Sequence, residues 1–166
     1  SLHQWRRAQG WQRAEQLDKL IHKFETDELL RLVTLIIDWT DREITYRGQP
    51  FSVQNDEVLL ALRDHSTIKD RPMFPGEQST IRDSYDALLS FFNRLDVAIT
   101  SDLIDAESAK SYFAYWLDHF LRFDKHPDKN DVLKGTVVET TVTRYIATYG
   151  DLDSVKRLCE HFKLNP

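Results

Sequence analysis

Two apolar seams constrain this chain more than any other feature of its sequence. In residues 81–99, apolar side chains recur in alternating steps of four and three, which is the spacing of a heptad. The same alternation returns in residues 109–123 after a short polar link, and the two seams consist of Ile81, Tyr85, Leu88, Phe92, Leu95, Ile99, Ala109, Phe113, Trp116, Phe120 and Phe123. The short link predicts a central antiparallel helical hairpin.

The composition agrees with a helical domain. The chain has 166 residues with only five glycines and five prolines, so turn signals are sparse. That length suffices for one core without disulfides or metals. The single cysteine, Cys159, fits a reducing compartment, and its helical neighbours predict a buried thiol. The predicted fold is all-α, a single-domain bundle of about six to seven helices over residues 1–166.

Hydrophobic spacing places the other helices. A first helix is predicted over about 3–24, and a second from Thr26 or Asp27 to about Ile44 or Tyr46. A shorter helix runs from Asn55 or Asp56 to about Arg63, before a loop at 64–78.

Capping signals place the remaining helix boundaries. Thr80 and Asp83 have the spacing of a capping box at the start of the long helix, and Asp105 can cap the next helix. A helix that includes residues 137–149 ends at Gly150, and Asp151 or Asp153 caps the last helix, which runs to about Lys163.

A charged pair interrupts the apolar stretch LLRLVTLIIDWTDREI at residues 29–44. Asp38 and Arg42 stand four residues apart, which places them on one face of the predicted helix as an ion pair. Three polar residues at the start of the long helix complete a candidate network with them, namely Arg82, Asp83 and Asp86. Such a network is compatible with a structural role or with an active site, because burial perturbs charged groups in both.

The beginning of the chain mixes tryptophan with arginine. The segment HQWRRAQGWQR carries Trp5 and Trp11 among Arg6, Arg7 and Arg13. This composition is typical of a segment next to a membrane, where indoles lie at the interface and basic residues stay on the cytoplasmic side. An ordinary surface helix whose tryptophans dock on a neighbour is the alternative. The five residues are therefore a candidate membrane-proximal or interaction patch.

No catalytic residue, cofactor, metal or small-molecule ligand is predicted. The sequence contains no HExxH, no paired CxxC and no GxSxG. A group of polar residues near the end of the hairpin has poor metal-ligand spacing; it comprises Asp118, His119, Asp124, His126, Asp128 and Asp131. A net charge of −5 makes nucleic acid an unlikely partner.

Several short motifs resemble an uncharacterised family of bacterial all-helical domains. They are WRRAQ at 5–9, DWTDREI at 38–44, DEVLLAL at 56–62, IRDSYDALLSFFNRLDVAI at 81–99 and YFAYWL at 112–117. Members of that family often follow an N-terminal membrane-spanning segment and have no settled activity. The resemblance implies an all-helical fold and a membrane-anchored context, and it covers residues 5–125.

The sequence therefore predicts a non-catalytic interaction or assembly domain that acts through a protein partner or through self-association. Its predicted location is the cytoplasm, at the inner face of a membrane if an anchor precedes it. The alternative from another class is a hydrolase or nucleotide-processing enzyme built on the carboxylate and arginine cluster.

Overall fold

The computed structural model describes residues 1–38, 41–69, 73–123 and 140–164. These residues form seven α-helices, one 3₁₀ turn and one two-stranded sheet around a single hydrophobic core, so the all-α fold class is confirmed. The helices are α1 (Leu2–Thr26), α2 (Glu28–Asp38), α3 (Asn55–Ala61), α4 (Gly76–Thr100), α5 (Ala106–Arg122), α7 (Thr141–Tyr149) and α8 (Leu152–Phe162). The strands are β1 (Arg42–Tyr46) and β2 (Gln49–Val53), and the 3₁₀ turn is η1 (His65–Thr67).

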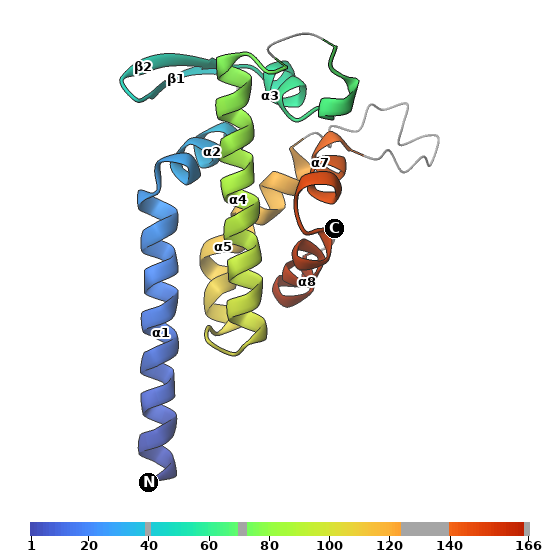
Figure 1. Ribbon diagram of the computed structural model, residues 1–166. Coiled ribbons are helices and arrows are strands. Elements are labelled where there is room, and N and C mark those ends of the chain that lie inside the picture. Colours follow the sequence, from blue (N-terminus) through green and yellow to red (C-terminus); the bar gives the residue numbers. More distant parts are fainter. Residues whose placement is uncertain (39–40, 70–72, 124–139, 165–166) are drawn as a thin grey trace.

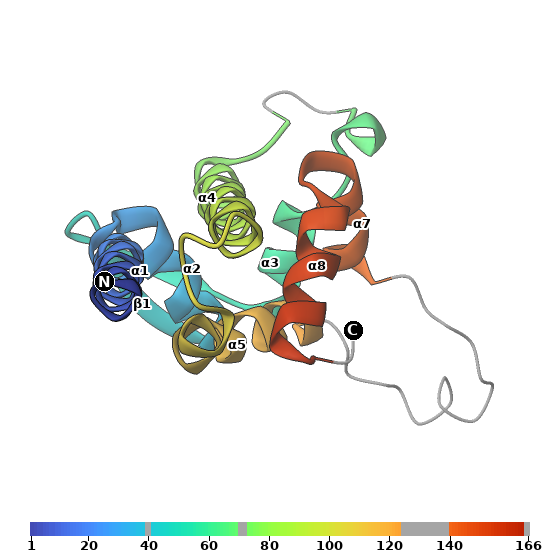
Figure 2. The same ribbon diagram turned by 90° about the horizontal axis from the view of Figure 1, so that it is seen from below.

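Helices α4 and α5 run in opposite directions and meet through aromatic rings. Phe91 lies 5.2 Å from Phe113, and further along α5 the ring of Phe120 lies 5.9 Å from Phe92 and 5.6 Å from Tyr85. Helices α2 and α8 each pack against both α4 and α5, on opposite sides of the pair (Figures 1 and 2). The centre of the core therefore lies between α4 and α5, with α2 and α8 on its other two sides.

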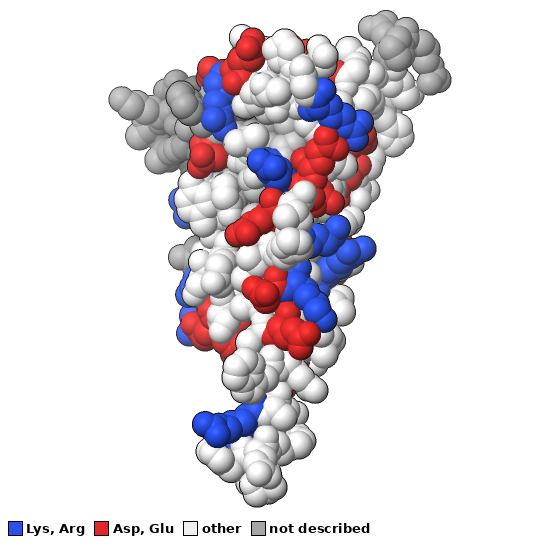
Figure 3. Space-filling view, turned by 90° about the vertical axis from the view of Figure 1, so that its left-hand side faces the viewer, with Lys and Arg blue, Asp and Glu red and all other residues white. Residues whose placement is uncertain are grey.

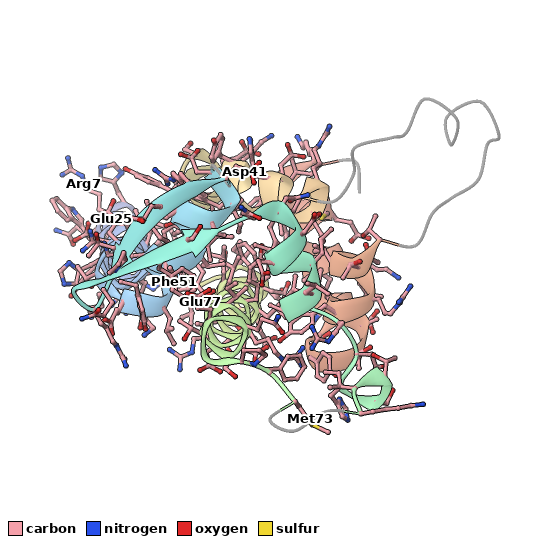
Figure 4. The ribbon with its side chains drawn as sticks, turned by 90° about the horizontal axis from the view of Figure 1, so that it is seen from above. Arg7, Glu25, Asp41, Phe51, Met73 and Glu77 are labelled. Carbon is pink, nitrogen blue, oxygen red and sulfur yellow. The ribbon has the colours of Figure 1, made fainter. Side chains whose placement is uncertain are left out.

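The second predicted helix is too long, because the chain forms a β-hairpin after Asp38. Strands β1 and β2 pair with a two-residue connection, Arg47-Gly48, and both of these residues have positive φ, 50° and 72°. A two-residue turn of this kind matches the twist of the strands. Ile44 pairs with Phe51 and both are buried, so one face of the hairpin packs on the core. Seen from above, the hairpin lies across α1 and α2 (Figure 4).

The long helix begins earlier than its capping signal indicated. Helix α4 starts at Gly76 after Pro75, and the hydroxyl of Thr80 donates to the carbonyl of Gly76 inside the helix. The predicted box at Thr80 and Asp83 is therefore wrong, because Pro75 already ends the preceding loop.

The other capping predictions on described residues are confirmed. Asp27 accepts from the backbone N–H of Leu30 at the start of α2, and Asp151 accepts from Ser154 at the start of α8. The thiol of Cys159 is buried, and Gly150 ends α7. Residues 137–139 of the predicted helix lie outside the described residues, and the described helix follows Thr140 as its cap.

Asp105 makes a testable contribution to the start of α5. Its carboxylate accepts from the backbone N–H and the hydroxyl of Ser108, and these hydrogen bonds hold the pKa of Asp105 below its ordinary value. We expect Asp105→Ala to cost about 1 kcal/mol at neutral pH. Since the folded-state pKa lies below the unfolded one, the cap stabilises fully above about pH 4 and is lost as the pH falls through the folded value.

Urea unfolding at several pH values measures this effect. Asp105→Asn is the control, because it keeps a capping oxygen but does not titrate. A cost of Asp105→Ala that is unchanged from neutral to acidic pH contradicts the assignment.

Candidate interaction surface

The structure separates the predicted polar network into two parts. Asp38 ends α2 and accepts a 2.8 Å hydrogen bond from the hydroxyl of Tyr115, which raises the pKa of that tyrosine. Arg42 lies on strand β1 and donates to the carbonyl of Leu35. The predicted pairing of Asp38 and Arg42 on one helix is wrong, because the helix ends before Arg42.

Arg82 forms the second part, and it is held by main-chain oxygens and rings. Its guanidinium donates to the carbonyls of Ala61 and Arg63 at 2.8 and 2.9 Å. It also lies over three aromatic rings, at 4.1 Å from Phe74, 4.8 Å from Tyr149 and 5.1 Å from Tyr145. Together these contacts fasten the segment after α3 and helix α7 to α4.

The two carboxylates beside Arg82 differ in their surroundings. Both are exposed, but Asp86 accepts a 2.6 Å hydrogen bond from the hydroxyl of Tyr145, a residue of α7. Burial, followed by this hydrogen bond, raises the pKa of Tyr145. No hydrogen bond or ion pair within the described ranges connects Asp38 with Arg82, Asp83 or Asp86, so the five predicted residues do not form one network.

Asp118 and His119 have local partners. Asp118 pairs with Arg122 one turn later, at 2.8 Å, and the ring of His119 stacks on Tyr115. The other four residues of the polar group, between 124 and 131, lie outside the described residues. Among the residues that are described, no group of three or more His, Cys, Asp or Glu is placed to hold a metal ion.

Asp96 is a buried carboxylate that the sequence did not indicate. It is 2% exposed on α4, and it accepts from the hydroxyl of Ser154 at 3.1 Å and from Arg157 Nε at 3.0 Å. His161 Nε2 lies 3.9 Å from its other oxygen. These three residues belong to α8, while the hydroxyl of Thr100 on α4 also donates to Asp96 at 3.4 Å. Asp96 therefore links the last helix to α4. The only sequence signal was an acidic residue next to the apolar seam.

Helix α1 begins well before the rest of the described fold (Figure 1), and we call its residues 2–12 the arm. The end of the arm, at Gln9, Gly10 and Gln12, lies beside the α4–α5 connection and the start of α5. Leu2, Trp5 and Trp11 are 65, 57 and 78% exposed, and the first buried side chain of α1 is Leu17. Arg13, at the base of the arm, forms an ion pair with Asp102 in the α4–α5 connection.

The arm is basic. Arg6 and Arg7 are exposed and enter no ion pair with any described residue, and acidic residues begin only at Glu15. On the face that Figure 3 shows, the lower tip carries Lys or Arg but no Asp or Glu. The predicted patch residues therefore share one half-helix, although Arg13 is already engaged with the body.

A period of three explains why the tryptophans are exposed. Apolar residues occupy every third position of α1 from Leu2 to Leu20, the full series being Leu2, Trp5, Ala8, Trp11, Ala14, Leu17 and Leu20. Each step of three turns this ridge by about 60° around the axis, because a helix has 3.6 residues per turn. The ridge that faces the core at Leu17 has therefore rotated away from it at Trp11.

A groove runs between α1 and α5. Two adjoining cavities, of about 420 and 340 Å³, form it, and Ile21 and Tyr112 line both. The upper cavity is mainly apolar, with Phe24, Trp116 and the exposed Leu35 of α2. We call this feature the α1–α5 groove.

Acidic side chains occupy the length of the α1–α5 groove. Asp18 and Asp105 line its lower cavity, and Glu25 lines its upper one. Asp18 and Glu25 form no ion pair with the residues that the structure describes. Of the two basic residues in the lining, Arg13 is neutralised by Asp102 and Arg31 remains beside the apolar part.

Comparisons with protein families, with curated proteins and with solved structures give no significant match. Within the described ranges, no helix combines the length and apolar character needed to cross a bilayer.

Proposed function

We propose that this protein is a non-catalytic helical interaction domain that associates through its arm. The observation that carries the proposal is the packing of α1, whose first buried residue is Leu17 although Leu2, Trp5 and Trp11 precede it. Two exposed tryptophans six residues apart on one helix are a large apolar area to leave in water. Tryptophan and arginine are among the residues most enriched at binding hot spots.

The contacts of Arg82 favour interaction over the alternative of a hydrolase or nucleotide-processing enzyme. An active site at this cluster would need Arg82 to reach a substrate. Its guanidinium is instead used by the carbonyls of Ala61 and Arg63 and covered by aromatic rings. A cation that satisfies main-chain acceptors in this way has a structural role.

The composition of the arm also supports the location predicted from the sequence. Arg6 and Arg7 without an acidic residue, together with Trp5 and Trp11, suit the cytoplasmic side of a membrane interface. We therefore include in the proposal that the domain works in the cytoplasm, near the inner face of a bacterial membrane.

Removing the two arm tryptophans tests the proposed function. We expect the wild-type protein to self-associate between about 1 µM and 1 mM, and Trp5→Ser/Trp11→Ser to weaken this association at least tenfold, roughly the loss expected for hot-spot residues. Sedimentation equilibrium measures the dissociation constant. Because both side chains are exposed, the thermal midpoint should stay the same.

Val97→Ser/Leu103→Ser is the matched control. These two residues are each 54% exposed but lie on α4 and after it, outside the arm. A control variant that weakens association as much as the arm variant contradicts the proposal, because general surface hydrophobicity would then be responsible.

A further inference from the structure

We propose that the arm of one copy binds in the α1–α5 groove of a second copy. This inference rests on the proposed function and names the partner and the site of the arm. Helix α1 supplies both the arm and one wall of the groove. Two copies that lie antiparallel along α1 therefore place each arm in the other copy's groove, and the two equivalent contacts close a symmetric dimer.

The arm and the groove agree in length. The α1 residues that line the groove extend from Gly10 to Glu25, which is about 22 Å at the rise of an α-helix. The arm, residues 2–12, is about 16 Å long on the same basis. The groove is therefore long enough to take the whole arm as a straight helix.

The charges of the two surfaces are complementary. The chain holds 22 basic and 27 acidic residues; residues 1–14 contain three of the basic and none of the acidic ones, which leaves 19 against 27, a net charge of −8 for the remainder. Within that acidic remainder, Asp18 and Glu25 line the groove and form no ion pair with a described residue. Arg6 and Arg7 on the arm likewise form no ion pair with a described residue. Opposite charges of this kind orient a docking helix and speed association.

The winding ridge of the arm favours a groove over a flat surface. Between Leu2 and Trp11 the ridge makes three steps, so these apolar side chains spread over about 180° of the helix circumference. A lipid surface contacts one face of a helix that lies on it, and therefore leaves part of such a ridge in water. The walls of the α1–α5 groove, from α1, α2 and α5, contact a helix from more than one side.

Pairing of arm with arm is disfavoured by charge. Each arm carries Arg6 and Arg7, so two arms side by side repel each other, and added salt would strengthen their association by screening. Binding of the arm in the acidic groove has the opposite dependence, since salt screens an attraction. The sign of the salt effect thus distinguishes the two dimers.

Charge reversal tests the inference in the full chain. We expect Asp18→Lys/Glu25→Lys and Arg6→Glu/Arg7→Glu each to weaken the dimer at least tenfold in sedimentation equilibrium. Combining all four changes in one chain should recover most of the loss, because the signs are then exchanged on both surfaces. Raising the salt from about 0.05 M to about 0.5 M should weaken the wild-type dimer.

Asp83→Lys/Glu160→Lys is the matched control, since it makes the same change of charge at two exposed acidic residues outside the groove. It should leave the dimer unchanged.

Three outcomes overturn this inference. In the first, the arm tryptophan variant abolishes the dimer but the Asp18/Glu25 reversal leaves it intact, and the proposed function then stands. In the second, the wild-type protein is a monomer at every concentration and sediments with vesicles of anionic lipid, which assigns the arm to a membrane. A monomer that does not bind those vesicles overturns this inference and removes self-association from the proposed function.

Discussion

Replacing Arg82 with leucine should lower the free energy of unfolding by about 3 kcal/mol, because two charge-assisted hydrogen bonds and the cation–π contacts are lost. The carbonyls of Ala61 and Arg63 lose their donor, and the three rings around the guanidinium lose the group that they enclose. The effect should concentrate in the segment after α3 and in α7, which Arg82 fastens to α4. Urea unfolding gives the free energy, and amide exchange shows which residues open.

Arg82→Lys separates charge from geometry. Lysine keeps the positive charge but has no planar group that stacks on Phe74 and donates to two carbonyls at once. We therefore expect the lysine variant to lose more than half of what the leucine variant loses. If Arg82→Lys is as stable as the wild type, only the charge matters and the stacked arrangement contributes nothing.

Replacing Asp96 with alanine should cost about 3 kcal/mol and detach α8. The carboxylate is buried and accepts hydrogen bonds from Ser154 and Arg157, and His161 lies 3.9 Å from it; all three residues lie on that helix. Without it, the buried hydroxyl of Ser154 has no acceptor and Arg157 no partner. Amide exchange in residues 152–162 should rise more than in α4, because α4 keeps its packing against α2 and α3.

Ser154→Ala is the control for the Asp96 variant. It removes one of the donors but leaves the ion pair with Arg157, so its cost should be close to 1 kcal/mol. Equal exchange in α8 and α4 after Asp96→Ala would mean that the carboxylate does not hold α8 in place.

The helices of the core could be predicted from the sequence, but their arrangement could not. Periodicity predicted α4 and α5 because large residues such as Phe92 and Phe120 repeat at heptad spacing. It did not predict that α2 and α8 pack on both sides of these two helices, since this depends on which apolar faces meet. The hairpin at β1 and β2 was missed because Ile44 and Tyr46 also continue a helical pattern, and only the Arg47-Gly48 turn indicates otherwise.

The residues of the candidate site could be predicted from the sequence, but the contacts that they make could not. The sequence shows the tryptophans and arginines of residues 5–13, but their exposure depends on how the ridge of α1 is turned relative to the body of the fold. The spacing of Asp38 and Arg42 fits one face of a helix, and it does not show that the helix ends at Asp38. Asp96 was missed because its donors, Ser154 and Arg157, follow about 60 residues later, and a pattern within one helix does not show such partners.

The hydrogen-bonded continuity of α1 sets the mechanical character of the arm. Helix α1 is a single helix from Leu2 to Thr26, and the ion pair of Arg13 with Asp102 attaches its midpoint to the body. The arm therefore behaves as a stiff spacer of fixed direction and not as a tether. A partner bound to it would be held at a set distance and orientation from the core.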